Sequence, residues 1–167
     1  MKVIIQRVLS ASVTVEQKLI SSIGKGILIF AAIAPWDTEK DIDRLVTKLL
    51  KIRIWDDESG SKWKKNVCDI SGEILCVSQF TLLASTKKGT KPNFRGALGS
   101  TQAKDLYQQF VSKMRSSYSP EKVKDGIFQA TMVLNLRQEV ALINDGPVTL
   151  EMSTEPTDPV DDTSSLA

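Results

Sequence analysis

The stretch CVSQFTLLASTKKGTKPNF, residues 76–94, joins an apolar strand to a basic loop. It continues an apolar run from Ile74, which predicts a central strand over Glu73–Phe80. Polar and apolar residues alternate from Ser78 to Thr81, and a loop rich in Lys, Gly and Pro follows. A buried strand that delivers hydroxyl and amide side chains beside a cluster of cations predicts a site for an anionic ligand.

A second stretch, NDGPVT at residues 144–149, has the same polar, Gly/Pro-containing character. Gly146 has no Cβ and lets the backbone approach a ligand closely. Pro147 fixes φ and removes one N–H donor. Taken alone, the segment predicts a turn with a trans bond, since only about 5–6% of X–Pro bonds are cis.

The chain around these stretches predicts one α+β domain. Apolar residues recur at helical spacing over Thr38–Lys51 and Thr101–Tyr118, and Lys124–Gly126 has the composition of a turn. Strand-like patterns occupy residues 2–8, 10–15, 19–23, 27–33, 52–55, 73–80, 128–136, 139–143 and 148–152. Strands around two helices predict a mixed or mostly antiparallel sheet. Two helices cannot cover both faces of seven or eight strands, so we expect a sheet folded into two layers with the helices outside (β/β/α) and a homodimer.

Composition places this domain at residues 1–152 of the 167 and predicts a cytoplasmic protein. The first residues interrupt their apolar run too early for a signal peptide, and no apolar run has the length of a membrane helix. Two cysteines, Cys68 and Cys76, show no metal-ligand spacing and are interpreted as reduced core thiols. Residues 153–167 hold four carboxylates and no Lys or Arg, which predicts a disordered acidic tail.

The sequence contains no histidine, and this restricts the chemistry. Ser-His-Asp and Cys-His nucleophiles and His-ligated zinc are excluded. The acidic turn Asp56–Gly60 is followed by no spaced ligand set, so neither a metal nor a cofactor is expected. What remains is hydrogen-bond donors at the ends of two strands, above all backbone N–H groups, which stabilise a developing oxyanion without a titrating base. A strand that ends in Ser, Gln and Thr is nevertheless more often structural than catalytic.

Together, the two stretches closely resemble the paired signature motifs of the D-aminoacyl-tRNA deacylase family. The resemblance covers residues 1–152 and includes the short matching segments Gln6–Val8, Ala11–Val13, Asp57–Gly60, Lys88–Phe94 and Val123–Gly126. It implies a homodimer that hydrolyses the ester between a D-amino acid, or glycine, and the terminal adenosine of tRNA.

The resemblance also implies roles for particular residues. Ser78, Gln79, Phe80 and Thr81 line the ester and supply oxyanion donors, and the adenosine 2′-hydroxyl assists. Gly146-Pro147 is cis, enters the partner's site and excludes L-amino acids by steric rejection. The remaining substrate contacts are Asn144, Arg7 as a brace for the Gly-Pro segment, and, at the phosphates of the acceptor end, Lys87, Lys88 and Lys91.

Two departures from the family pattern concern the geometry. Gln129 stands where the family usually has Gly, and about six extra residues lie near Val133–Gln138, directly before the Gly-Pro segment. A bulge would absorb the extra residues without a change of register. Two other functions stay open: a non-catalytic dimeric RNA-binding module that uses the basic segments Lys62–Lys65 and Lys87–Arg95, and a hydrolase of another acyl ester.

Overall fold

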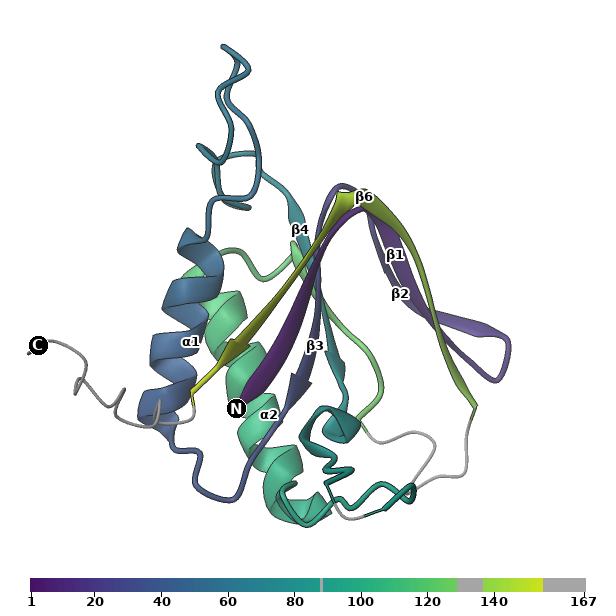
Figure 1. The fold of residues 1–167 in the computed structure, drawn as a ribbon. Coiled ribbons are helices and arrows are strands. Elements are labelled where there is room, and N and C mark those ends of the chain that lie inside the picture. The colour runs from purple at the N-terminus through teal and green to yellow at the C-terminus, as the bar shows by residue number, and fades with distance from the viewer. Residues whose placement is uncertain (88, 129–136, 155–167) are drawn as a thin grey trace, which may run out of the picture.

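The computed structural model describes residues 1–87, 89–128 and 137–154. In chain order the elements are β1 (Lys2–Val15), β2 (Lys18–Ile23), β3 (Gly26–Ala32), α1 (Glu39–Lys51), β4 (Glu73–Ser78), the 3-10 helix η1 (Phe80–Leu83), α2 (Ser100–Ser117), β5 (Val123–Asp125) and β6 (Gln138–Ser153). Both α-helices pack on the same side of the sheet (Figure 1).

A single mixed sheet contains the six strands of the described residues, in the order β2-β1-β3-β4-β5, with β6 on the free side of β1. Strand β1 pairs antiparallel with β2, β3 and β6, whereas β3–β4 and β4–β5 are parallel. Because β1 is long, its first half pairs with β3 and its second half with β2. β1 and β6 bend together, which curls the sheet toward a barrel (Figure 1).

Helix α1 forms where the sequence predicts it. Thr38 and Asp41 make a capping box, in which the Thr38 backbone N–H donates to the Asp41 carboxylate at 2.9 Å. The hydrogen bonds from Thr38 lower the pKa of this carboxyl. The buried face of α1 consists of Ile42, Leu45, Val46, Leu49 and Leu50. It packs with α2 and the inner residues of β1, β3 and β4 into the main core.

A second hydrophobic cluster fills the opposite face of the sheet. It joins Val8, Ala11, Val13 and Val15 of β1 to residues of β2, β3 and β4, namely Ile23, Leu28, Leu75 and Val77. The bend in β1 carries its second half across this face. β3 and β4 are therefore buried on both sides, as their continuous apolar runs predict.

Several predicted boundaries are wrong. Residues 2–15 form one strand, and so do residues 138–153, because pairing along β1 holds each of them together across its irregular positions. The predicted turn Lys124–Gly126 lies mostly in β5, which pairs with β4. The predicted strand at residues 52–55 is reduced to a bridge between Trp55 and Lys65. The predicted strand at residues 128–136 and the predicted tail disorder at residues 155–167 lie outside the described residues.

Of the two cysteines, only Cys76 is a core thiol. Burial raises its pKa far above the usual thiol range, while Cys68 is half-buried with a smaller upward pKa shift from the same cause. Both are free in this structure. No helix in the described residues has the length and apolar character that a membrane span requires.

Candidate functional site

The first part of the candidate site is η1, directly after β4. Strand β4 ends at Ser78, and the Gln79 N–H donates to the Ala31 carbonyl of β3 at 2.8 Å. The chain then turns into a 3-10 helix instead of continuing the predicted strand to Phe80. The Phe80 ring packs on Phe94, with ring centroids 5.2 Å apart, which holds η1 to the end of the basic loop.

Helix η1 presents backbone donors at its beginning. Its first internal hydrogen bond is from the Leu82 N–H to the Gln79 carbonyl, at 3.1 Å. The N–H groups of Phe80 and Thr81 precede that bond, so they have no acceptor within the helix. Two neighbouring N–H groups of this kind can stabilise an oxyanion.

The Thr81 hydroxyl accepts a hydrogen bond from the Gln79 side-chain amide. An amide does not take up a proton at neutral pH, so this contact orients the hydroxyl without activating it as a nucleophile. Thr81 is exposed, and Ser78, Gln79 and Phe80 are half-buried. All four predicted catalytic residues therefore gather at one end of β4.

The second part of the site is a bulge in β6. Val8 pairs with Asn144 and Gln6 with Thr149, so the four residues Asp145–Val148 stand opposite Arg7 alone. The Asn144 side chain closes the bulge by accepting the Val148 N–H at 3.2 Å. The predicted turn is thus an insertion within a continuous edge strand.

Arg7 holds this bulge from the neighbouring strand. Its Nε donates to the Asp145 carbonyl at 2.9 Å and lies 3.2 Å from Asp145 Oδ2, while its Nη1 contacts the Ile54 carbonyl. The Arg7 side chain is 15% exposed, so these bonds are largely shielded from water. The bracing contact predicted for Arg7 is present.

The tip of the bulge, Gly146-Pro147, is exposed, and its peptide bond is cis as the resemblance implied. Gly146 has φ +129°, a conformation that residues with a Cβ rarely adopt. A Cβ there would lie 3.0 Å from Arg7 Nη2 and 3.0 Å from Val148 Cγ2. Glycine is therefore required by both the backbone conformation and the neighbouring side chains.

Within one chain the two parts of the site do not meet. The Gln79 N–H donates to the Ala31 carbonyl, and Ala31 pairs with Val3 of β1. The bulge, in contrast, stands opposite Arg7 of β1. Four residues of strand separate these points, about 13 Å along β1. The bulge also lies on the opposite side of β1 from β3 (Figure 1).

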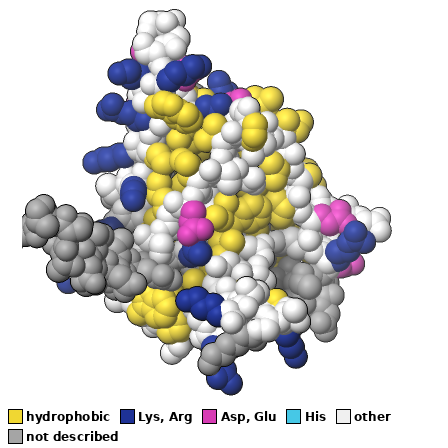
Figure 2. All heavy atoms as spheres, viewed as in Figure 1, with side chains coloured by type: hydrophobic (Ala, Val, Ile, Leu, Met, Phe, Trp, Pro, Cys, Tyr) yellow, Lys and Arg dark blue, Asp and Glu magenta, His cyan; other side chains and the backbone are white. Residues whose placement is uncertain are grey.

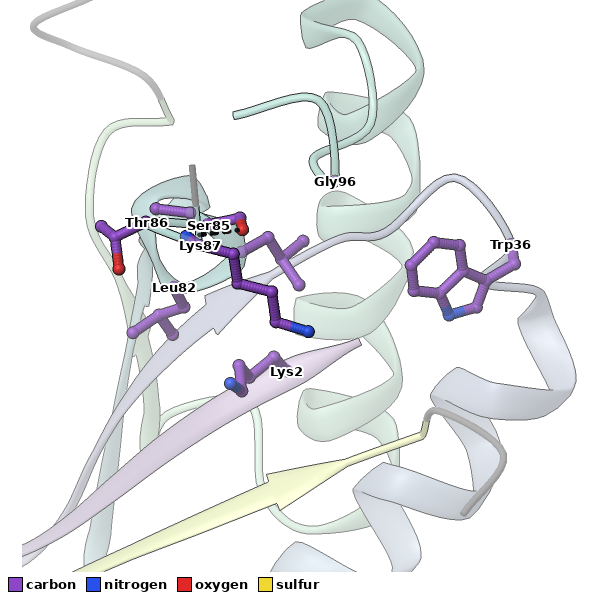
Figure 3. A pocket seen from close by; sticks show the side chains of 9 residues that line it. Lys2, Trp36, Leu82, Ser85, Thr86, Lys87 and Gly96 are labelled. Carbon is purple, nitrogen blue, oxygen red and sulfur yellow. Dashed lines mark hydrogen bonds between the residues drawn. The ribbon is translucent and has the colours of Figure 1, made fainter. Parts of the chain in front are cut away.

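A cavity of about 520 Å³ opens on the far end of η1 (Figure 3). Leu82 and Leu83 form one wall, Trp36 stands opposite, and the Lys87 side chain extends between Trp36 and Lys2. Of the predicted basic residues, Lys87 thus reaches the cavity, Lys91 is exposed, and Lys88 lies outside the described residues. Lys2 and Trp36 also line the cavity but are not among the site residues predicted from the sequence. A Trp between Pro and Asp in a short loop is nevertheless a signal of an exposed ring.

The carboxylates of the acidic turn Asp56–Gly60 are bound by groups of the same loop. Asp57 accepts the Ser59 hydroxyl at 2.6 Å and the N–H groups of Ser59 and Ser61, each at 2.9 Å. These hydrogen bonds, above all the one from the Ser59 hydroxyl, lower its pKa. Asp56 and Glu58 pair with lysines of the same loop. In the three described ranges, no group of three or more His, Cys, Asp or Glu residues could hold a metal ion.

A comparison with known protein families identifies the family to which this chain belongs. The model of the family described as D-Tyr-tRNA(Tyr) deacylase matches residues 4–153. The chain belongs to the D-Tyr-tRNA(Tyr) deacylase family. The family expected from the two motifs is confirmed, and the enzyme class with it.

Individual relatives agree with this assignment. The chain is 46% identical over 155 residues to the D-aminoacyl-tRNA deacylase of Saccharomyces cerevisiae, covering 93% of this chain and 99% of the relative. It is 45% identical over 154 residues to D-aminoacyl-tRNA deacylase 1 of Homo sapiens, covering 92% and 70%.

Solved structures agree as well. A structure described as c-Myc DNA Unwinding Element Binding Protein matches with TM-score 0.86 and 44% identity, covering 93% of this chain and all of the other. A structure described as a probable eukaryotic D-amino acid tRNA deacylase matches with TM-score 0.74 and 18% identity, over 90% and 97% of the two chains. That second likeness shows the fold.

The departures from the deacylase family pattern lie mostly outside the described residues, since these omit Gln129 and residues 133–136. The pairing of β6 begins at Gln138, which faces Val15, and continues without a shift to Val13 opposite Val140 and on to Ser10 opposite Ile143. The strand is also paired beyond the bulge, from Thr149 to Ser153. The Gly-Pro bulge therefore stands opposite Arg7 in a strand that is paired on both sides of it.

Proposed function

We propose that this protein hydrolyses the ester bond of D-aminoacyl-tRNA, and of glycyl-tRNA, releasing the amino acid and the tRNA. Its substrate is the acceptor end of the charged tRNA, its place of action is the cytoplasm, and it needs no cofactor. The observation that carries the proposal is the exposed Gly146-Pro147 bulge, which Arg7 holds rigidly outward from an edge strand. Family membership supports the reaction class.

The chemistry follows from the donors of η1. Water adds to the ester carbonyl carbon, and the N–H groups of Phe80 and Thr81 bind the resulting oxyanion. The bond to the ribose oxygen then breaks, and that oxygen leaves as a hydroxyl with a proton from the attacking water. No histidine is available to move this proton, so the adjacent 2′-hydroxyl of the substrate assists the transfer.

The bulge selects the chirality of the amino acid. A backbone projection with a fixed position leaves room for hydrogen but not for a side chain on one side of the α-carbon. The Gly146 and Pro147 carbonyls occupy that side, so L-amino acids are rejected by steric exclusion. Glycine, which has no side chain, is not excluded and is hydrolysed with the D-amino acids. Asn144 acts indirectly, because it closes the bulge.

The site is completed by a second copy of the chain. One protomer keeps its bulge about 13 Å along β1 from its own η1, so a partner must bring the bulge to the ester. Leu9 and Ile143, exposed by 51% and 59%, lie beside the bulge on β1 and β6 and would be covered in a homodimer. In Figure 2, hydrophobic side chains gather over the middle of the molecule, around the bend of β1 and β6.

Release of amino acid from D-tyrosyl-tRNA and L-tyrosyl-tRNA, with EDTA present, tests this function. The proposal predicts rapid release from the D-ester and slow release from the L-ester. Equal hydrolysis of both esters contradicts selection by the bulge. Binding of tRNA without any release of amino acid contradicts the proposed deacylase activity.

The second candidate is a nucleic-acid-binding module without turnover. It is favoured by the similarity to a structure whose description names DNA unwinding element binding. This candidate predicts binding that weakens steeply with salt and is insensitive to changes at Gly146. The same tRNA experiment separates the two, because only the deacylase releases the amino acid.

A further inference from the structure

We propose that the cavity beside η1 binds the unpaired nucleotide that precedes the terminal adenosine of tRNA. Its base stacks on Trp36, and its phosphate lies between Lys2 and Lys87. This inference rests on the proposed function, because it assigns a second contact to the same substrate. The volume of about 520 Å³ lies within the range of small-ligand sites.

The charge of the cavity suits a phosphate. Its lining contains two lysines and no Asp or Glu. Among the described residues, the Lys87 ammonium has no ion-pair partner, and Lys2 pairs with Glu151 at 3.2 Å. That Glu151 carboxylate is 54% exposed, so the pair is weak and leaves Lys2 able to meet an anion.

Trp36 provides the surface for a base. Its side chain is 50% exposed and stands across the cavity from Leu82 (Figure 3). The loop beneath it is rigid, because buried Asp37 accepts the Ala34 N–H at 2.6 Å and donates its own N–H to the Ala34 carbonyl at 3.1 Å. An exposed aromatic ring on a fixed loop, next to two lysines, is how proteins recognise unpaired nucleotides.

The same aspartate also places Lys2. Asp37 Oδ1 contacts the Met1 ammonium and accepts the Thr154 hydroxyl at 2.9 Å, which fixes the start of β1. The backbone segments that carry Trp36 and Lys2 are therefore fixed on the two sides of the cavity. Binding does not have to order these segments first, which lowers its entropic cost.

The position of the cavity along η1 connects it to the ester. The beginning of η1 carries the backbone donors, and Leu82 and Leu83 at its end line the cavity. Four residues of 3-10 helix span about 8 Å. An RNA strand that runs from the ester along η1 therefore brings the nucleotide before the terminal adenosine to the cavity.

The test compares two substrates, D-tyrosyl-tRNA and the D-tyrosyl ester of adenosine alone. Replacing Trp36 by Ala is expected to raise KM for the tRNA roughly tenfold, by loss of one stacked base, and to leave hydrolysis of the adenosine ester unchanged. Trp36→Phe retains a ring and recovers most of the loss. Leu19→Ala is the matched control, since Leu19 is an apolar side chain that is 59% exposed on β2, does not line the cavity and should not alter either rate.

A second arm measures binding of an uncharged RNA hairpin that ends in the single-stranded sequence CCA. Wild type should bind it more tightly than Trp36→Ala, and Lys87→Gln should flatten the salt dependence. Equal loss on both esters, or no loss on either, overturns the cavity assignment. If wild type hydrolyses neither ester, the proposed function fails, and equal binding of the hairpin by wild type and Trp36→Ala overturns the cavity assignment separately.

Discussion

The two halves of the candidate site are built in opposite ways. Helix η1 is held from within, by the hydrogen bond between the Gln79 N–H and the Ala31 carbonyl and by packing of Phe80 on Phe94. The bulge at Gly146-Pro147 is held at its base, by Arg7 and by the Asn144 side chain, and its tip is exposed. This difference is the reason why the proposed function assigns the bulge to the site of a second protomer.

The largest effect is expected from adding a methyl group at the tip. Gly146→Ala places a Cβ 3.0 Å from Arg7 Nη2 in a backbone conformation that disfavours Ala, so the bulge shifts. Displacement on the order of 1 Å costs roughly a hundredfold in rate, so kcat/KM for D-tyrosyl-tRNA should fall by about that factor. Steady-state kinetics on both enantiomers measure this.

Gly60→Ala is the control for that change. Gly60 also has a positive φ, of +80°, but no atom lies within 4 Å of its missing Cβ. It should lose some stability and keep its activity. Full activity of Gly146→Ala would refute a role for the bulge.

Removing the brace should have a smaller effect than changing the tip. Arg7→Ala loses the contacts to Asp145 and Ile54, so the bulge becomes mobile and the ratio of D to L hydrolysis should fall roughly tenfold. Arg137→Ala removes an exposed arginine that pairs with Glu139 and should change neither rate nor selectivity. Unaltered selectivity in Arg7→Ala would mean that β6 holds the bulge without it.

On the η1 side, removal of the Thr81 hydroxyl should have only a modest effect. Thr81→Val keeps the shape and the backbone N–H but loses the contact with the Gln79 amide, so kcat should fall by only a fewfold. Single-turnover release of D-tyrosine measures the chemical step directly. A loss of a thousandfold or more would instead identify Thr81 as the nucleophile.

The smallest effect concerns the hydrogen bond between Tyr107 of α2 and Asp125 of β5. Tyr107 donates to half-buried Asp125 at 2.7 Å, and the partial burial raises the pKa of this carboxyl despite that bond and nearby Arg115. The folded state then binds the proton more tightly than the unfolded state. This group's contribution to stability therefore falls as pH rises above its unfolded pKa of about 3.9.

Denaturant unfolding of wild type and Asp125→Asn between pH 4 and 7 measures this contribution. The difference in unfolding free energy, wild type minus variant, should decrease with rising pH. A difference that stays constant or increases with pH would contradict a raised pKa.

The sequence predicts local features well and long-range pairing poorly. The core face of α1 and its capping box follow from the spacing of apolar residues and from Thr38 with Asp41. The Lys124–Gly126 segment looks like a turn but becomes strand, because β4 offers it a free edge. Likewise, the 144–149 segment has turn residues but stays within β6, because β1 pairs on both sides of it.

For the site, the residue types predict the two halves but not their separation. The contact of Arg7 with Asp145 and the cavity between Lys2, Trp36 and Lys87 depend on which strands become neighbours. Those neighbours are set by tertiary packing over long sequence distances. A pattern within either motif carries no information about them.

The most direct test mixes two defective proteins. One carries Gly146→Val, which damages the bulge, and the other carries Phe80→Ala, which damages η1. Each alone should hydrolyse D-tyrosyl-tRNA poorly. After subunit exchange, half of the dimers are mixed, and one of the two sites in each mixed dimer is intact, so activity should return to about a quarter of wild type. No recovery, although mixed dimers form, would contradict a site built from two chains.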